Sequence, residues 1–210
     1  MTPEDFQART GVSRETLARL STYAALLEKW QKAINLVAGK TLPELWERHF
    51  LDSAQLLALA PPGTRRWLDL GSGGGFPGLV IAAMGMESVH LVESDQRKGA
   101  FLREAARAMG VSATVHVKRI EAVDPVALHA ALGGAPEVIS ARALAPLEEL
   151  LPLAHRLAGP EAIYLLPKGR QAQDELTAAR RYWTITQLEM LPSQTDPAAN
   201  ILRIRGLQPA

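Results

Sequence analysis

The sequence predicts an α/β fold, in which seven strands form a mostly parallel sheet and an N-terminal helical extension precedes it. Three observations predict this fold. From residue 64 onward short apolar runs alternate with helical stretches, a glycine-rich segment follows the first run, and the last two runs succeed one another without a helix. We therefore divide the chain into a helical extension, residues 1–63, packed on the core, and a sheet domain, residues 64–210.

The composition is typical of a folded chain, with 210 residues of which 47% are hydrophobic and 21% charged. The longest uncharged stretch, residues 70–86, holds six glycines and a proline and does not resemble a membrane span. No signal segment opens the chain and there is no cysteine, so we expect a cytoplasmic protein. The five histidines have no metal-site spacing, so we expect no metal. The net charge of +1 neither requires nor excludes a polyanionic partner.

The extension has helical periodicity. A helix is predicted to begin after Ser13, a suitable N-cap, and to end near Asn35. Its apolar stripe comprises Leu17, Leu20, Ala24 and Leu27. Thr41 and Glu44 have the spacing of a capping box, which predicts a second helix with a broad apolar face over residues 45–56. A Pro-Pro-Gly triplet then ends the extension.

In the sheet domain, strands and crossover helices alternate. The apolar runs predict strands at residues 67–70, 88–93, 113–118, 137–141, 162–166, 183–190 and 201–205. The helical stretches predict helices near residues 77–84, 95–109, 125–132, 146–157 and 171–181. Because only a turn-rich segment separates the last two strands, we expect them to form an antiparallel hairpin that closes the sheet.

A glycine-rich loop follows the first strand and opens a helix. It reads Asp69-Leu-Gly71-Ser-Gly73-Gly-Gly75-Phe76-Pro-Gly78. Glycines let the backbone pass close to a ligand. Glu93 ends the next strand, where a carboxylate can accept hydrogen bonds from two ribose hydroxyls. Loop and acid together predict a site for an adenosine-containing cofactor.

The identity of that cofactor depends on Asp69. The segment Gly73–Gly78 also matches the pattern of nicotinamide-cofactor enzymes, but a carboxylate at the end of the first strand would repel a pyrophosphate. The same carboxylate suits S-adenosylmethionine, whose sulfonium-bearing tail has an amino group to bind. The residues thus favour a methyltransferase over a dehydrogenase. They leave open whether its substrate is a nucleic acid, a small molecule or a protein, or whether the chain is a non-catalytic RNA-binding or assembly module.

Several further motifs occur in the order seen in one family. They are Asn35-Leu-Val-Ala38, Arg48-His-Phe-Leu-Asp-Ser53, the glycine loop, Glu93 with Arg97-Lys98 and Phe101-Leu102, Ala141-Arg-Ala143 and Lys168-Gly169. Over residues 20–206 the chain resembles the bacterial 16S ribosomal RNA guanine-N7 methyltransferases of the RsmG or GidB family. The resemblance implies a Rossmann-like class I fold, S-adenosylmethionine as the methyl donor, and a guanine of the 530 loop of 16S rRNA as the acceptor.

The residues and the resemblance together give the predicted site residues. Those expected to bind the cofactor are Asp69, Gly71, Gly73, Gly75, Phe76, Glu93, Ile120, Glu121 and Arg142. Those expected to bind the substrate are Arg142, Lys168 and Arg203. Family members commonly carry an Arg-His pair just before the last strand, where this chain has Ala199-Asn200.

The chemistry of such a transfer requires little of the side chains. Guanine N7 is a lone-pair nucleophile that needs no deprotonation, so we expect no dedicated catalytic residue. We interpret His49, beside aromatic residues on a helix face, as a packing residue without a chemical role. We expect Asp52 and Ser53 to fix their helix against the glycine loop. Because the net charge is near zero, we expect the assembled or assembling small ribosomal subunit to be preferred over a short free RNA.

Overall fold

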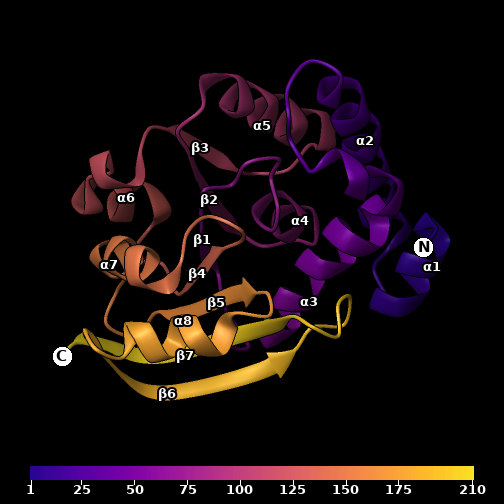
Figure 1. Ribbon diagram of the computed structural model, residues 1–210. Coiled ribbons are helices and arrows are strands. Elements are labelled where there is room, and N and C mark those ends of the chain that lie inside the picture. The colour runs from indigo at the N-terminus through magenta and orange to yellow at the C-terminus, as the bar shows by residue number, and fades with distance from the viewer.

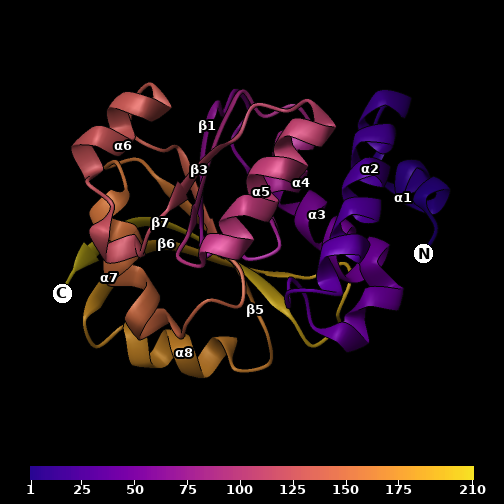
Figure 2. The ribbon, with the colours of Figure 1, turned by 90° about the horizontal axis from the view of Figure 1, so that it is seen from above.

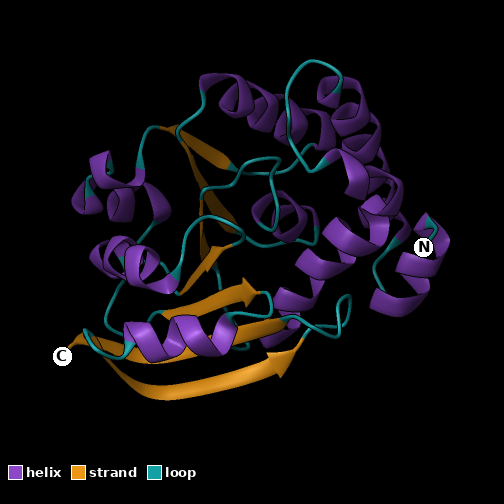
Figure 3. Ribbon diagram, viewed as in Figure 1, coloured by secondary structure: helices purple, strands orange, loops and turns teal.

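The computed structural model describes all residues, 1–210, and has a seven-stranded sheet with helices on both faces (Figures 1 and 3). The strand order is β3-β2-β1-β4-β5-β7-β6. The five strands from β3 to β5 pair in parallel, and β7 runs antiparallel to both β5 and β6. The predicted α/β fold and its closing hairpin are confirmed.

Each predicted strand is present. The strands are β1 (Arg66–Leu70), β2 (Ser88–Glu93), β3 (Thr114–Val117), β4 (Val138–Ala141), β5 (Ile163–Lys168), β6 (Trp183–Pro192) and β7 (Asn200–Pro209). The last two are longer than predicted because they pair with each other over nearly their whole length, up to the connection at residues 193–199. Periodicity alone misses the polar ends of such a pair.

Helices cover the two faces of the sheet separately, as Figure 2 shows. The helices of the sheet domain are α4 (Gly78–Ala83), α5 (Gln96–Met109), α6 (Pro125–Leu132), α7 (Leu147–Leu157) and α8 (Ala172–Ala179). Trp67 packs in the core with α4 and α5, whereas Leu68 packs in a second core with α6, α7 and α8. Because strand side chains alternate between the faces, the central parallel strands are apolar on both.

The N-terminal extension shares the first of these cores. It comprises α1 (Pro3–Thr10), α2 (Arg14–Gln31), a 3-10 helix (Gly39–Glu44), a π-helix (Trp46–Leu51) and α3 (Asp52–Leu59). Phe6, Tyr23 and Leu27 are fully buried, and α2 packs along α5. Side chains of the extension therefore come close to the glycine loop. No helix of the molecule is both long and apolar enough to cross a membrane.

Two predictions for the extension are wrong. The helix α2 ends at Gln31, not near Asn35. Thr41 does not begin an α-helix, because its hydroxyl bonds to the Ala38 carbonyl and to His49 instead of capping an amide. The chain passes through the 3-10 and π segments before α3 begins at Asp52.

Candidate functional site

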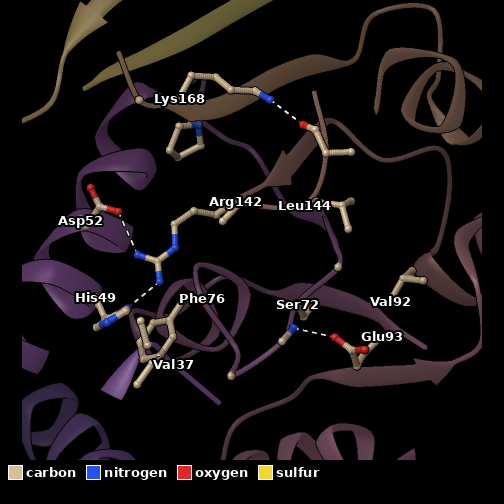
Figure 4. Close-up of a pocket in the computed structure, with 18 of the residues that line it drawn as sticks. Val37, His49, Asp52, Ser72, Phe76, Val92, Glu93, Arg142, Leu144 and Lys168 are labelled. Atoms are coloured by element: carbon tan, nitrogen blue, oxygen red, sulfur yellow. Dashed lines mark hydrogen bonds and ion pairs between the residues drawn. The ribbon is translucent and has the colours of Figure 1, made fainter. Parts of the chain in front are cut away.

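A cavity of about 970 Å³ opens at the carboxyl edge of the sheet (Figure 4). It lies beyond the ends of β1, β2, β4 and β5, and the crossover connections reverse direction between β1 and β4. This reversal leaves a crevice in which open α/β sheets bind ligands. Most predicted site residues line this cavity, namely Gly71, Gly73, Phe76, Glu93, Ile120, Glu121, Arg142 and Lys168.

One side of the cavity is the glycine wall, which we define as residues 71–76 together with Glu93. Gly71, Gly73 and Gly75 have φ values of 66°, 54° and 94°, a region that favours glycine. A Cβ on Gly71 would lie 2.5 Å from Cδ1 of Leu144. A Cβ on Gly73, by contrast, would meet no heavy atom closer than 3.8 Å. The space beside Gly71 is therefore filled by the tip of the Leu144 side chain, whereas at Gly73 the protein leaves space beside the backbone.

Glu93 is tied to the loop that it faces. One carboxylate oxygen accepts from the amide of Gly73 at 2.8 Å and the other from the amide of Asp95 at 2.8 Å. Residues beyond the next strand extend this side of the cavity, with Ile120 buried and Glu121 exposed. The loop, Glu93 and the segment after β3 thus line one side of the cavity, because β1, β2 and β3 are neighbours in the sheet.

Two predicted cofactor contacts do not line the cavity: Asp69, which precedes the glycine wall, and Gly75, which is part of it. Asp69 is fully buried and accepts a hydrogen bond from the Ser140 hydroxyl at 2.7 Å. Burial raises the pKa of Asp69 to about 6, although the Ser140 hydrogen bond opposes the shift. The other carboxylate oxygen, Oδ2, has no hydrogen-bond partner. The expected contact of Asp69 with the amino group of the cofactor stays a prediction.

Tyr23 of the extension holds the rear of the same loop. Its hydroxyl donates to the carbonyl of Gly74, and its ring stacks on Phe76 with centroids 5.3 Å apart. Burial raises the pKa of Tyr23 well above its usual value, so the hydroxyl keeps its proton and remains a donor. A Cβ on Gly75 would run into this hydroxyl, which explains why a glycine is needed at a position that does not face the cavity.

The opposite side of the cavity is the arginine wall, which we define as Arg142, His49, Asp52 and Thr195. Arg142 follows β4, and its Nη1 donates to Asp52 Oδ2 at 2.9 Å and to the carbonyl of Arg48 at 3.1 Å. Its Nη2 donates to His49 Nδ1 at 2.6 Å, and its guanidinium lies 5.3 Å from the centre of the Phe76 ring. Arg142 therefore joins the sheet to the π-helix of the extension.

Asp52 connects this wall to the C-terminal hairpin. Its Oδ2 accepts from Arg142, while its Oδ1 accepts from the Thr195 hydroxyl at 2.8 Å. Nearby, Arg48 pairs with Asp196 at 3.3 Å. The expectation that Asp52 holds its helix against the glycine loop is thus corrected, because its partners belong to the arginine wall. Ser53 is buried, and its hydroxyl has no hydrogen-bond partner.

His49 is the residue that sequence reasoning missed. It is buried beside Phe76, and both ring nitrogens are hydrogen-bonded, Nδ1 to Arg142 and Nε2 to Thr41 at 2.7 Å. Burial, together with the charges of Arg142 and Arg48, lowers the pKa of His49 to about 3. The three-residue spacing of His49 and Asp52 was the available signal, because it places both on one helical face.

Besides Arg142, two basic residues were predicted to bind the substrate, and they lie in different places in the structure. Lys168 lines the cavity and donates to the Ala145 carbonyl at 2.7 Å and to Glu175 at 2.8 Å. Arg203 does not line the cavity, because it pairs across the hairpin with Glu189 at 2.8 Å. Lys168 thus lies in the cavity and Arg203 on the hairpin outside it, and the contact of each with RNA stays a prediction. No group of three or more metal-ligating side chains is found in the structure.

Comparisons with known proteins identify the family of this chain. The family model described as rRNA small subunit methyltransferase G matches residues 16–200. The ribosomal RNA small subunit methyltransferase G of Rhodospirillum centenum is 57% identical over 206 residues, covering 98% of this chain and 91% of the relative. The protein of the same name from Parvibaculum lavamentivorans is 58% identical over 208 residues, covering 97% and 89%.

Solved structures resemble this chain in fold. A ribosomal protein L11 methylase from Lactobacillus delbrueckii is 16% identical, with a TM-score of 0.55 and coverage of 74% of this chain and 76% of that one. TYW2 of P. horikoshii, solved in complex with MeSAdo, is 16% identical, with a TM-score of 0.53 and coverage of 74% and 61%. The chain has a Rossmann-like methyltransferase fold and belongs to the rRNA small subunit methyltransferase G family.

Proposed function

We propose that this chain transfers a methyl group from S-adenosylmethionine to N7 of a guanine in the 530 loop of 16S ribosomal RNA. The observation that carries the proposal is the cavity, in which a glycine wall stands opposite an arginine wall at the carboxyl edge of the sheet. Membership of an rRNA methyltransferase family supplies the class of reaction and substrate. The acceptor atom and the RNA loop are those implied by the family resemblance.

The glycine wall fits an S-adenosylmethionine molecule. Gly73 lines the cavity, and the space beside its α-carbon is free of protein atoms within 3.8 Å, so a ligand can approach the backbone there. Glu93 offers carboxylate oxygens to ribose hydroxyls at the end of β2. Ile120 and Glu121 then lie where the adenine ring is expected. A similar fold, TYW2, was solved with MeSAdo, which is consistent with this assignment.

The proposed chemistry is a direct displacement. When bound, S-adenosylmethionine supplies a methyl group activated by its sulfonium. The lone pair of guanine N7 forms the new N–C bond, the C–S bond breaks, and its electron pair stays on sulfur, so the positive charge moves to the purine. Because no proton has to leave N7, the protein has to align the reactants and needs no general base. Arg142 lines the cavity as part of the arginine wall, where its charge is suited to hold the cofactor or guanine O6.

Lys168 and Arg203 differ as candidates for contact with RNA. Lys168 lines the cavity and has a third ammonium proton beyond those given to Ala145 and Glu175, so we keep it on the substrate side. We leave Arg203 out of the proposed site, because its partner Glu189 lies on β6 outside the cavity. We further propose that the protein acts in the cytoplasm on the assembled or assembling small subunit.

The experiment that tests the proposal is methyl transfer from labelled S-adenosylmethionine to small subunits that lack the modification, followed by nucleoside analysis. We expect label in 7-methylguanosine from the 530 loop, with lower turnover on a naked 530-loop hairpin. Label in another nucleoside would overturn the proposed acceptor atom. Cofactor binding without any transfer to RNA would redirect the search to protein or small-molecule acceptors, and the absence of cofactor binding would favour a non-catalytic RNA-binding module.

A further inference from the structure

Three hydrogen bonds in series run through the arginine wall from Arg142 to the extension. Arg142 Nη2 donates to His49 Nδ1 at 2.6 Å, His49 Nε2 lies 2.7 Å from the Thr41 hydroxyl, and that hydroxyl donates to the Ala38 carbonyl at 2.7 Å. A guanidinium is only a donor, so Nδ1 of His49 must be the unprotonated nitrogen. The proton of the neutral ring is therefore on Nε2 and is donated to Thr41.

The surroundings of His49 keep the ring neutral. Its side chain is buried against Phe76, and the positive charges of Arg142 and Arg48 both oppose a charge on the ring. A protonated Nδ1 would also point its hydrogen at an N–H of Arg142, so the hydrogen bond would be lost. The ring consequently acts as a fixed acceptor for the arginine.

Arg142 has five N–H groups, and the protein binds three of them. Two on Nη1 go to Asp52 and the Arg48 carbonyl, and one on Nη2 goes to His49. No protein acceptor binds the N–H on Nε or the second N–H on Nη2. These two nitrogens are neighbours on the guanidinium, an arrangement that binds a pair of acceptor atoms such as a carboxylate. In Figure 4, Asp52 and His49 lie on the side of Arg142 away from Glu93 and Ser72.

We infer that His49 is a positioning residue for Arg142: by accepting from Nη2 it fixes the rotation of the guanidinium, so that the Nε and Nη2 edge remains free for a ligand in the cavity. Asp52 and the Arg48 carbonyl both bind Nη1, and these two contacts at one nitrogen leave the guanidinium able to rock about it. The second link, from His49 to Thr41, in turn prevents the imidazole from rotating. This inference rests on the proposed function in one respect, because it takes the ligand of Arg142 to be the cofactor.

Two substitutions distinguish the roles of the two ring nitrogens of His49. In H49N the side-chain amide oxygen can occupy the place of Nδ1, so the acceptor for Arg142 is kept and the contact with Thr41 is lost. In H49Q the amide nitrogen can reach the place of Nε2, so the contact with Thr41 is kept and the acceptor for Arg142 is lost. Both variants lose the imidazole ring, so we expect them to lower the melting temperature by similar amounts.

The readout is the affinity for S-adenosylmethionine, measured by calorimetry without RNA. We expect H49N to stay within about 3-fold of the wild type and H49Q to be weaker by about 10-fold or more. In transfer assays H49Q should raise KM for the cofactor and leave kcat within about 2-fold, because His49 contacts no reacting atom. H90Q is the matched control. His90 is also buried and hydrogen-bonded, to His116, but it lies outside the cavity, so the affinity of H90Q for S-adenosylmethionine should equal that of the wild type.

Equal affinities of H49N and H49Q at equal stability would overturn the inference, as would a fall in kcat without a change in KM. If H49Q does not fold, T41V and T41S test the second link, since T41S keeps the hydroxyl. We expect T41S to match the wild type and T41V to bind about 3-fold more weakly; identical affinities would contradict the inference. If the two His49 variants differ in cofactor affinity but no 7-methylguanosine forms with wild-type protein, the proposed acceptor fails and the role of His49 stands.

Discussion

The two walls of the cavity are built in different ways. The glycine wall is almost one continuous stretch of chain, residues 71–76, whose shape is set by positive φ angles and by contacts of the backbone. The arginine wall is assembled by side chains from three distant segments, as in the bonds of Asp52 to Arg142 and to Thr195. One wall is local in sequence, and the other exists only in the folded chain.

This difference predicts different consequences of substitution. A side chain added to the glycine wall occupies ligand space and should act on affinity, with a modest effect on stability. A side chain removed from the arginine wall leaves buried polar partners unpaired, so it should lower both cofactor affinity and stability. The following variants test that contrast, from the largest expected effect to the smallest.

Gly73→Val should abolish detectable cofactor binding, a loss of more than about 1,000-fold. The new side chain would stand in the cavity, and Val at a φ of 54° adds backbone strain of about 1 to 2 kcal/mol. Gly110→Val is the matched control, because Gly110 has a φ of 64° at the end of α5 and no neighbour within 4 Å of its Cβ position. Calorimetry measures the cofactor affinity of both variants, and urea unfolding measures their stability. If Gly73→Val still binds the cofactor, the ligand lies elsewhere.

Asp52→Ala should lower the free energy of unfolding by about 3 kcal/mol as well as weaken cofactor binding. The substitution leaves Arg142, whose side chain is only 18% exposed, without its carboxylate partner. The control is Glu137→Ala, since Glu137 pairs with Arg66 at 2.7 Å at the other end of the sheet and is more exposed. We expect that control to leave affinity unchanged. If Asp52→Ala alters affinity without any loss of stability, the proposed difference between the walls is wrong.

Asp69→Asn should change how stability depends on pH. Because burial raises the pKa of Asp69 from 3.8 to about 6, the folded state binds more protons than the unfolded state in this window. The contribution of Asp69 to stability is therefore present below pH 4 and is lost as the pH rises through 6. Between pH 4 and pH 7, the free energy of unfolding of Asp69→Asn should therefore rise by about 3 kcal/mol relative to that of the wild type.

Urea unfolding at several pH values measures this difference. The control is Asp95→Asn at the start of α5, where the amides of Lys98 and Arg97 lower the pKa of Asp95 despite slight desolvation. The stability that Asp95 contributes is present above its unfolded pKa and is lost as the pH falls, so its variant should show the opposite sign. If the free energies of unfolding of Asp69→Asn and the wild type differ by the same amount at every pH, Asp69 does not carry a buried charge beneath the glycine wall.

Tyr23→Phe should have the smallest effect, about 1 kcal/mol in stability and about 5-fold in cofactor affinity. It removes the hydroxyl that donates to Gly74 and leaves that carbonyl without this partner. Tyr164→Phe is the matched control, because Tyr164 is equally buried, lies on β5 and does not line the cavity. Equal affinities for the two variants would mean that the glycine wall keeps its shape without support from the extension.

Much of the fold was predictable from the sequence because its elements are locally encoded. The strands β1, β2 and β4 are buried on both faces and read as apolar runs. The helix α1 was missed because Phe6 is its only buried residue, so no apolar stripe marks it. Thr2 and Asp5 nonetheless form a capping box that does mark its start.

The sequence by itself determined the sheet, the glycine loop and the acid that faces it. Gly71, Gly73 and Glu93 are placed by the ends of two adjacent parallel strands, and this geometry follows from alternating strands and helices. The sequence also indicated the hairpin that places β7 between β5 and β6.

Only the tertiary structure decided which of the predicted residues reach the cavity. Asp69 and Gly75 belong to the glycine motif, yet neither lines the cavity; Ser140 lies against Asp69, and Tyr23 lies against Gly75. His49 became the acceptor for Arg142 because a π-helix brings it to the end of β4. These pairings join residues between 51 and 93 positions apart in the sequence. Their geometry depends on the packing of whole elements, which local periodicity does not encode.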